Sequence, residues 1–206
     1  MDAPDLIGSY RLLEHPFYRR WEAGELRAGE LADYAAQYRH FEAQLPDFLT
    51  ALCTIAGDES TRSLVCANLA EELGDPIAHV ELFERFAVAV DAPDVEPSPA
   101  MRALIEVYAA SLRQGNEAEA LGVLAGYELQ AAEVAASKGD GLAAHYDVDE
   151  RGRSFWSHHA EVEVEHAAWT MEALSTKDPE AVRRGAKASA AAWWAFLDER
   201  EALVSV

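Results

Sequence analysis

The sequence has little cysteine and no long apolar run, and each shortage excludes a class of protein. Only Cys53 and Cys66 occur among 206 residues, which excludes a disulfide framework and a CxxC metal or redox motif, so we expect two reduced core residues. No stretch approaches the roughly 18 uninterrupted apolar residues of a membrane-spanning helix. The first eight residues also lack the basic and apolar regions of a signal peptide, and we therefore expect a cytoplasmic protein.

Basic residues are scarce as well. Lys and Arg number 17 against 37 Asp and Glu, which gives a formal net charge of −20. A surface of this charge repels a phosphate backbone and an anionic membrane. We therefore expect small molecules as partners, with no nucleic acid and no membrane.

The pattern that is present is helical. Apolar residues recur at spacings of three and four with Ala, Leu, Glu and Arg between them, and alternating stretches rich in Val, Ile and Thr are absent, so the fold class is all-α. The length fits one domain over residues 1–206. Asn116 and the Asp178-Pro179 pair fit helix starts, and Ser60 precedes a helical run. We expect roughly seven to nine helices in a bundle, with breaks at Pro16, 24–29, 57–60, 74–76, 91–99, Gly115, 139–141, 147–152 and 175–179.

The densest group of reactive side chains lies in residues 155–166. At 100° per residue, His159, Glu163 and His166 fall at about 0°, 40° and 340°, so they share one helix face. Glu163 and His166 also form the Glu-x-x-His pair used by di-iron bundle proteins. Two imidazoles and a carboxylate suit iron or manganese. The alternative is a charged face in contact with solvent.

Two further segments offer candidate ligands. Glu72 and His79 are seven residues apart, but Gly74 and Pro76 argue for a helix break, so their alignment depends on the turn, and the alternative is a helix end with solvated acids. Glu128 lies in a largely apolar helix, where it needs a partner if it points inward; it could equally point outward. Three carboxylates beside two divalent ions leave a charge of about +1, which suits binding of an anion.

The order and spacing of these motifs resemble a known family. The segments that carry the resemblance are HPFYRRWEAGEL (15–26), DYAAQYRHF (33–41), NLAEELG (68–74), YELQ (127–130), SKGDGL (137–142) and residues 159–166. The chain resembles the haem-oxygenase-like diiron oxidases, and most closely their CADD subgroup, which is linked to folate metabolism and related to PqqC and TenA. The resemblance implies a haem-oxygenase-like single-domain helical bundle and a homodimer.

The resemblance also implies a metal centre. Six positions match the family's metal ligands: Glu72, His79, Glu128, His159, Glu163 and His166. The family usually has Asp where this chain has Glu163, whose longer side chain should still reach a metal. The implied cofactor is a pair of metal ions, Fe/Fe or Mn/Fe, with dioxygen and a reductant as co-substrates.

The activity that the subgroup implies is the formation of para-aminobenzoate, for folate synthesis, from the enzyme's own side chains. Tyr18 matches the tyrosine that supplies the ring and Lys138 the lysine that supplies the nitrogen, while Tyr34 and Tyr127 match accessory tyrosines. Lys138 lies ten residues after Glu128, about 15 Å along an unbroken helix, so it reaches the metals only if the chain bends near Gly139.

Other interpretations stay open on the sequence. A sibling oxidase could act on an external amine, amino acid or fatty acid, and a non-catalytic interaction module would need no metal. Lys138 could instead lie near a helix C-terminus, where its positive charge interacts favourably with the helix dipole. Tyr34 and Tyr38 could be core aromatics whose hydroxyls form hydrogen bonds with the metal ligands. We interpret the four remaining histidines, His15, His40, His145 and His158, as surface or capping residues.

Overall fold

The computed structural model describes residues 3–74 and 77–203, and these residues form helices and no strand. The predicted all-α class is therefore confirmed. The elements are α1 (Ala3–Ile7), α2 (Pro16–Glu22), α3 (Ala28–Glu42), α4 (Leu45–Ile55), α5 (Glu59–Leu73), α6 (His79–Ala89), α7 (Pro99–Arg113), α8 (Glu117–His145), α9 (Glu150–Leu174) and α10 (Pro179–Ala202), with a 3-10 helix at Leu12–Glu14. Eight of the α-helices have 11 residues or more, within the predicted range.

Most helix ends lie where capping chemistry predicts them. The side chain of Asn116 accepts a hydrogen bond from the Glu119 amide at 3.2 Å and starts α8, and Asp178 caps α10 ahead of a proline. At α5 the cap is Asp58, not Ser60, because the Asp58 carboxylate accepts from the Thr61 amide at 2.8 Å. A break at residues 43–44 between α3 and α4 was not predicted. Asp75 and Pro76, in the predicted break at 74–76, lie outside the described residues.

The predicted break at 139–141 is wrong, because α8 continues through it to His145. A side chain at Gly141 would meet Trp21, whose Cδ1 atom lies 2.8 Å from the position of a Cβ. The Trp21 indole N–H also donates to the carbonyl of Lys138 at 3.2 Å. Tight packing of an aromatic ring against the helix thus outweighs the roughly 1 kcal/mol by which each glycine disfavours a helix.

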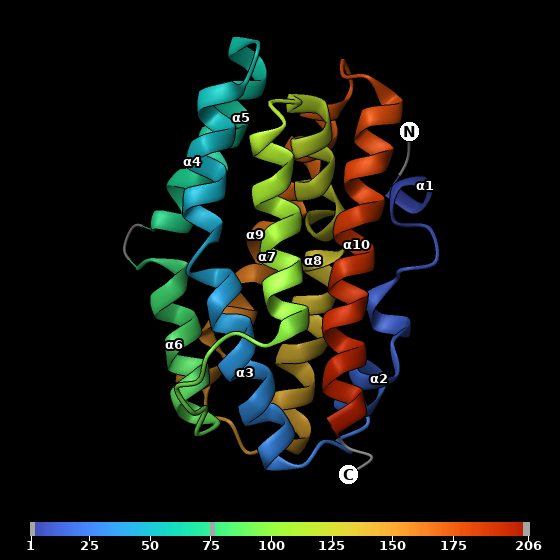
Figure 1. Ribbon diagram of the computed structural model, residues 1–206. Coiled ribbons are helices and arrows are strands. Elements are labelled where there is room, and N and C mark those ends of the chain that lie inside the picture. The colour runs from blue at the N-terminus through green and yellow to red at the C-terminus, as the bar shows by residue number, and fades with distance from the viewer. Residues whose placement is uncertain (1–2, 75–76, 204–206) are drawn as a thin grey trace.

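The helices form a bundle in which some span the whole length and others follow each other end to end (Figure 1). The long helices α8 and α10 run the full length, whereas α4 continues beyond the end of α3 and α6 continues below α5. The joint between α3 and α4, like the end of α5 and the start of α6, lies away from the two ends of the bundle. Such joints let helix ends point side chains into the interior.

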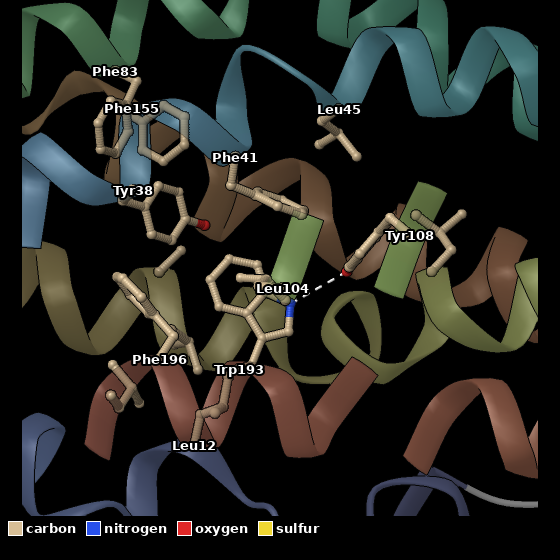
Figure 2. Packing of buried hydrophobic residues seen from close by; sticks show 14 of the residues in the cluster. Leu12, Tyr38, Phe41, Leu45, Phe83, Leu104, Tyr108, Phe155, Trp193 and Phe196 are labelled. Atoms are coloured by element: carbon tan, nitrogen blue, oxygen red, sulfur yellow. Dashed lines mark hydrogen bonds between the residues drawn. The ribbon is translucent and has the colours of Figure 1, made fainter. Parts of the chain in front are cut away.

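An aromatic core fills the bundle beside the joint between α3 and α4 (Figure 2). The ring of Trp193 packs against Phe41 with centroids 4.6 Å apart, and its N–H donates to the Tyr108 hydroxyl at 3.2 Å. Tyr38 stacks on Phe83 at 5.0 Å. All five side chains are less than 5% exposed, and burial of a ring of this size contributes about 2–3 kcal/mol.

Helices α8 and α10 approach each other backbone to backbone. A Cβ at Gly122 would lie 2.2 Å from the carbonyl oxygen of Val182, and one at Gly185 would lie 2.1 Å from that of Glu119. The neighbouring atoms belong to helix backbone and cannot move alone. The two glycines therefore set the spacing of the two helices.

The two cysteines correct a prediction. Cys53 of α4 and Cys66 of α5 form a disulfide, with Cα atoms 5.8 Å apart, a separation typical of bridged cysteines. Both residues are half-buried, so the expectation of reduced core residues is wrong. The turn at residues 56–58 places the two helices side by side, which a spacing of 13 residues does not reveal.

In the described part of the chain, no helix is long and apolar enough to cross a membrane.

We predict that Gly185→Ala lowers the free energy of unfolding by about 1–3 kcal/mol, because the new methyl group forces α8 and α10 apart. Urea denaturation followed by circular dichroism measures the change. Gly29→Ala is the matched control, since a Cβ there has no neighbour within 4 Å, and its stability should be unchanged or slightly raised. Equal stability of the two variants would contradict close helix contact.

Candidate metal centre

The structure brings the six predicted metal ligands into the interior of the bundle. Glu72 ends α5, His79 starts α6, Glu128 lies on α8, and the remaining three lie on α9. All six are between 0 and 6% exposed. They form two triads, each with ligand atoms within 4.8 Å of one another. Site 1 consists of Glu72, His79 and His159, and site 2 consists of Glu128, Glu163 and His166.

Site 1 depends on the turn between α5 and α6. His79 Nδ1 lies 3.0 Å from the Glu72 carboxylate, and the rings of His79 and His159 are 4.5 Å apart. Gly74 follows α5 with φ of 70°, and a Cβ there would lie 2.1 Å from the carbonyl oxygen of Ile77. Only glycine fits this left-handed, crowded position. The turn therefore aligns Glu72 and His79 across the break.

Site 2 joins one carboxylate of α8 to the Glu-x-x-His pair of α9. His166 Nδ1 lies 3.5 Å from a Glu163 oxygen and 3.8 Å from a Glu128 oxygen. The other oxygen of Glu128 accepts a hydrogen bond from the Asn68 amide group at 3.3 Å. The pair predicted from helical spacing thus points inward together with Glu128.

Unpaired buried atoms test whether these residues fit metal ions. Four buried atoms of the two sites lack a hydrogen-bond partner in the described residues: His79 Nδ1, His166 Nδ1, Glu128 Oε2 and Glu163 Oε2. Such atoms cost about 1–3 kcal/mol each when left unpaired. Divalent ions would satisfy all four, and the mixed imidazole and carboxylate donors suit iron or manganese. The residues therefore fit a pair of metal ions.

The pKa shifts of the site residues in the absence of metal also favour a cation-binding site. Burial, reinforced by Glu72 and Glu71, raises the pKa of Glu163 to about 8. Burial and the neighbouring Glu163 hold the pKa of Glu128 well above its usual range. Burial and His79 hold the pKa of His159 well below its usual range. Without a cation the centre therefore favours neutral side chains, and a bound cation would restore the carboxylates.

The predicted catalytic residues form a second buried cluster. The Tyr18 hydroxyl lies 2.9 Å from that of Tyr34, which accepts a hydrogen bond from Lys138 Nζ at 2.5 Å. Lys138 Nζ also lies 4.6 Å from the Tyr18 ring centroid and 4.2 Å from that of Trp156. Lys138 is 1% exposed. It joins Tyr18 from an unbroken helix, without a bend near Gly139.

The tyrosine hydroxyls bond one another, which corrects the idea that Tyr34 and Tyr38 bond metal ligands. Tyr38 pairs with Tyr127 at 2.8 Å, as Tyr34 pairs with Tyr18. Burial raises the pKa of all four phenols. Burial also lowers the pKa of Lys138 well below its usual range, because a buried ammonium loses its hydration. Burial therefore favours the uncharged form of the phenols and of the amine in this cluster.

Comparison with known proteins identifies the family. A model described as "iron-containing redox enzyme" matches residues 32–198. The chain belongs to this family of iron-containing redox enzymes. It is 30% identical over 201 residues to a Chlamydia pneumoniae protein named 4-aminobenzoate synthase, covering 93% of this chain and 89% of that relative. A Nitrosomonas europaea protein of the same name is 30% identical over 213 residues, covering 94% and 87%.

Solved structures agree on the fold of this family member. A domain from Shewanella denitrificans with a haem-oxygenase-like fold superposes with a TM-score of 0.77 at 19% identity, covering 98% of this chain and 90% of that one. A CADD-like protein from Nostoc punctiforme superposes with a TM-score of 0.76 at 17% identity, covering 98% and 94%. The predicted haem-oxygenase-like fold is confirmed.

Sequence reasoning missed a buried carboxylate beside the sites. Glu42 is 4% exposed, and its Oε2 atom has no hydrogen-bond partner in the part of the chain described. Burial, with Glu72 and Glu163 nearby, raises its pKa well above the usual range. Among 37 acidic residues no motif marks it. Its spacing of four and eight residues from Tyr38 and Tyr34, on one face of α3, was the available signal.

One of the four remaining histidines was misassigned. His15 is buried, and its Nδ1 caps α2 by accepting from the Phe17 amide at 3.1 Å, so its capping role is confirmed. His158 Nε2 lies 2.9 Å from His79 Nε2, so it is neither a capping nor a simple surface residue. His40 and His145 are not in either site, and His145 is exposed.

We predict that metal binding competes with protons. The Glu163 carboxyl keeps its proton from pH 4.5, its ordinary pKa, to about 8 in the folded chain. This contribution to the stability of the metal-free protein is therefore present below pH 4.5 and lost as the pH rises through about 8. Over the same interval the affinity for Mn²⁺ should rise. Calorimetry in buffers of different ionisation enthalpy should detect proton release on binding, and binding without proton release would contradict the prediction.

Proposed function

We propose that this member of the family forms 4-aminobenzoate from its own Tyr18 ring and Lys138 nitrogen, with an Fe/Fe or Mn/Fe pair as cofactor and dioxygen and a reductant as co-substrates. One observation carries the proposal: the Lys138 Nζ lies over the Tyr18 ring, 4.6 Å from its centroid. The names of the relatives from Chlamydia pneumoniae and Nitrosomonas europaea support the same product.

Lys138 is suited to act as a nucleophile. An ammonium group has no lone pair, whereas burial lowers the pKa of Lys138 well below its usual range and so favours the neutral amine, which has one. The rings of Tyr18, Tyr34, Tyr38 and Trp156 surround Nζ at 4.2–5.1 Å. These rings exclude water and hold the nitrogen against the face of the ring that it would attack.

Tyr18 is suited to lose an electron together with a proton. Burial raises its pKa, so the phenol enters the reaction protonated. Loss of an electron makes a phenol far more acidic, and the Tyr34 hydroxyl at 2.9 Å is the hydrogen-bond partner of the Tyr18 hydroxyl. When bound, a pair of redox-active metal ions would supply the oxidising power for this step.

Aromatic side chains connect the amine cluster with the metal ligands. Trp156 contacts Lys138 Nζ at 4.2 Å and the Phe155 ring at 4.8 Å. Phe155 in turn lies 3.9 Å from the His159 ring. The rings of Trp156 and Phe155 thus form a continuous path between the Tyr18–Lys138 pair and site 1.

We predict that Tyr18→Phe and Lys138→Met each lower 4-aminobenzoate formation at least 100-fold while two metal ions stay bound, because each removes a reacting atom outside the ligand set. Mass spectrometry after addition of iron, manganese, reductant and air measures the product. Tyr10→Phe and Lys187→Met are matched controls, since Lys187 is exposed and Tyr10 packs on Trp194. Product from ¹⁵N-lysine-labelled protein should carry the label, at no more than one product per chain.

Two outcomes would contradict this proposal. Full product from either variant would remove Tyr18 or Lys138 from the reaction. Many turnovers upon addition of an external amine or amino acid, with Lys138 intact by peptide mapping, would favour a sibling oxidase with an external substrate.

Lys138→Met should also change how stability depends on pH. The folded pKa of Lys138 lies below the unfolded value of 10.5, so the unfolded chain binds more protons between the two values. Wild-type stability therefore gains up to about 1.4 kcal/mol per pH unit from this residue as the pH rises toward 10.5. Urea denaturation of both metal-free proteins at pH 7 and 9 should show the variant losing relative stability at pH 9, and parallel curves would refute a neutral buried lysine.

A further inference from the structure

His79 and His166 each have Nδ1 facing a metal site. In both residues the other ring nitrogen, Nε2, contacts a side chain that is not a candidate metal ligand. His166 Nε2 lies 2.7 Å from the Glu71 carboxylate in site 2. His79 Nε2 lies 2.9 Å from His158 Nε2 in site 1. Both supporting residues are only partly buried, and the Glu71 side chain is 36% exposed. They link the buried sites with the surface of the bundle.

These contacts fix which nitrogen carries the proton. A carboxylate can only accept, so His166 must donate to Glu71 from Nε2, which leaves the Nδ1 lone pair facing Glu163 and Glu128. His79 reaches the same state if it donates from Nε2 to His158, and its unpaired Nδ1 faces Glu72. A metal ion would therefore meet Nδ1 of both residues.

His159 carries its proton on the other ring nitrogen. Its Nδ1 donates to the carbonyl oxygen of Phe155 at 2.8 Å, so Nε2 is left for the metal. The backbone of α9 supports this ligand, whereas side chains support the other two. Loss of Glu71 or His158 would therefore free one imidazole in one site only.

The two supports also differ in charge. Site 1 has one carboxylate ligand and a neutral imidazole behind His79. Site 2 has two carboxylate ligands and the Glu71 carboxylate behind His166. A carboxylate that accepts from a ligating imidazole raises the basicity of that ligand and adds negative charge near the ion. Glu71 thus widens the difference in charge between the sites.

We propose that Glu71 and His158 are positioning residues, Glu71 for the metal ion of site 2 and His158 for that of site 1, and that Glu71 makes site 2 the more strongly binding site. This inference rests on the proposed two-metal centre. It predicts that each support affects one site only, which a general effect on folding would not do.

Co²⁺ binding to the full-length, metal-free protein tests the assignment, since visible absorption reports this air-stable ion in imidazole and carboxylate sites. Glu163→Ala leaves site 1 intact and His159→Ala leaves site 2 intact. In the His159→Ala protein, Glu71→Ala should weaken Co²⁺ binding about 10–100-fold. Glu71→Gln should weaken it less, because the amide oxygen still accepts from His166. In the Glu163→Ala protein, His158→Ala should have the corresponding effect.

The decisive comparison combines each supporting-residue variant with the protein that keeps only the other site. Glu71→Ala in the protein with site 1 alone, and His158→Ala in the protein with site 2 alone, should change affinity less than about threefold. Glu165→Gln is the charge control, because this exposed carboxylate precedes His166 on α9. If a single-site protein loses helicity, the two stepwise Co²⁺ binding constants are measured in the chain with both sites intact instead. Glu71→Ala should then weaken the stronger of the two binding steps.

Failure of the inference and failure of the proposed function are distinguishable. If the wild-type protein binds two Co²⁺ ions and Glu71→Ala leaves both constants unchanged, the positioning role of Glu71 is overturned and the metal centre stands. An equal loss in both sites would also overturn it. If the wild-type protein binds no Co²⁺, the two-metal centre itself is wrong.

Discussion

Glu72, Glu128 and Glu163 lie almost fully buried in a helical bundle, and no arginine or lysine forms an ion pair with them among the residues described. Burial of a carboxylate without a counter-ion is costly, and the chain has two ways to avoid the cost. It can keep the carboxyls protonated, or it can bind cations that restore their charge. The placement of three imidazoles beside them, with unpaired Nδ1 atoms in two cases, favours the second way.

The helix ends make this concentration of ligands possible. A continuous helix presents one stripe to the interior, as α9 does with three ligands. The end of α5, the start of α6 and the end of α3 add Glu72, His79 and Glu42 to the same region. Gly74 allows the first two to face each other. Two short helices placed end to end thus supply ligands that one long helix cannot supply.

The aromatic cluster solves a different problem, which is to keep an amine neutral. Burial of Lys138 outweighs the attraction of the Glu42 carboxylate, so the pKa of the lysine falls. The same rings that exclude water hold Tyr18 beneath the nitrogen. The candidate metal ligands and the Tyr18–Lys138 pair are therefore neighbours separated by the rings of Trp156 and Phe155.

The sequence by itself determined the features that follow from local periodicity and capping. The helical class, most helix ends and the shared face of His159, Glu163 and His166 depend on spacing along one helix, which the sequence specifies directly. The prediction of the other three candidate ligands needed the family resemblance, because nothing local says where Glu72, His79 and Glu128 point.

Only the tertiary structure decided the remaining features, because they depend on which segments pack together. Trp21 packs against the unbroken α8 at Gly141 and donates to the carbonyl of Lys138, whose Nζ lies over the Tyr18 ring. The α4–α5 turn pairs the two cysteines. Glu71 and His158 acquire partners from helices far away in the sequence. Contacts between residues about 80 to 120 positions apart leave no periodic trace in a single sequence, so these residues could be recognised only once the helices were in place.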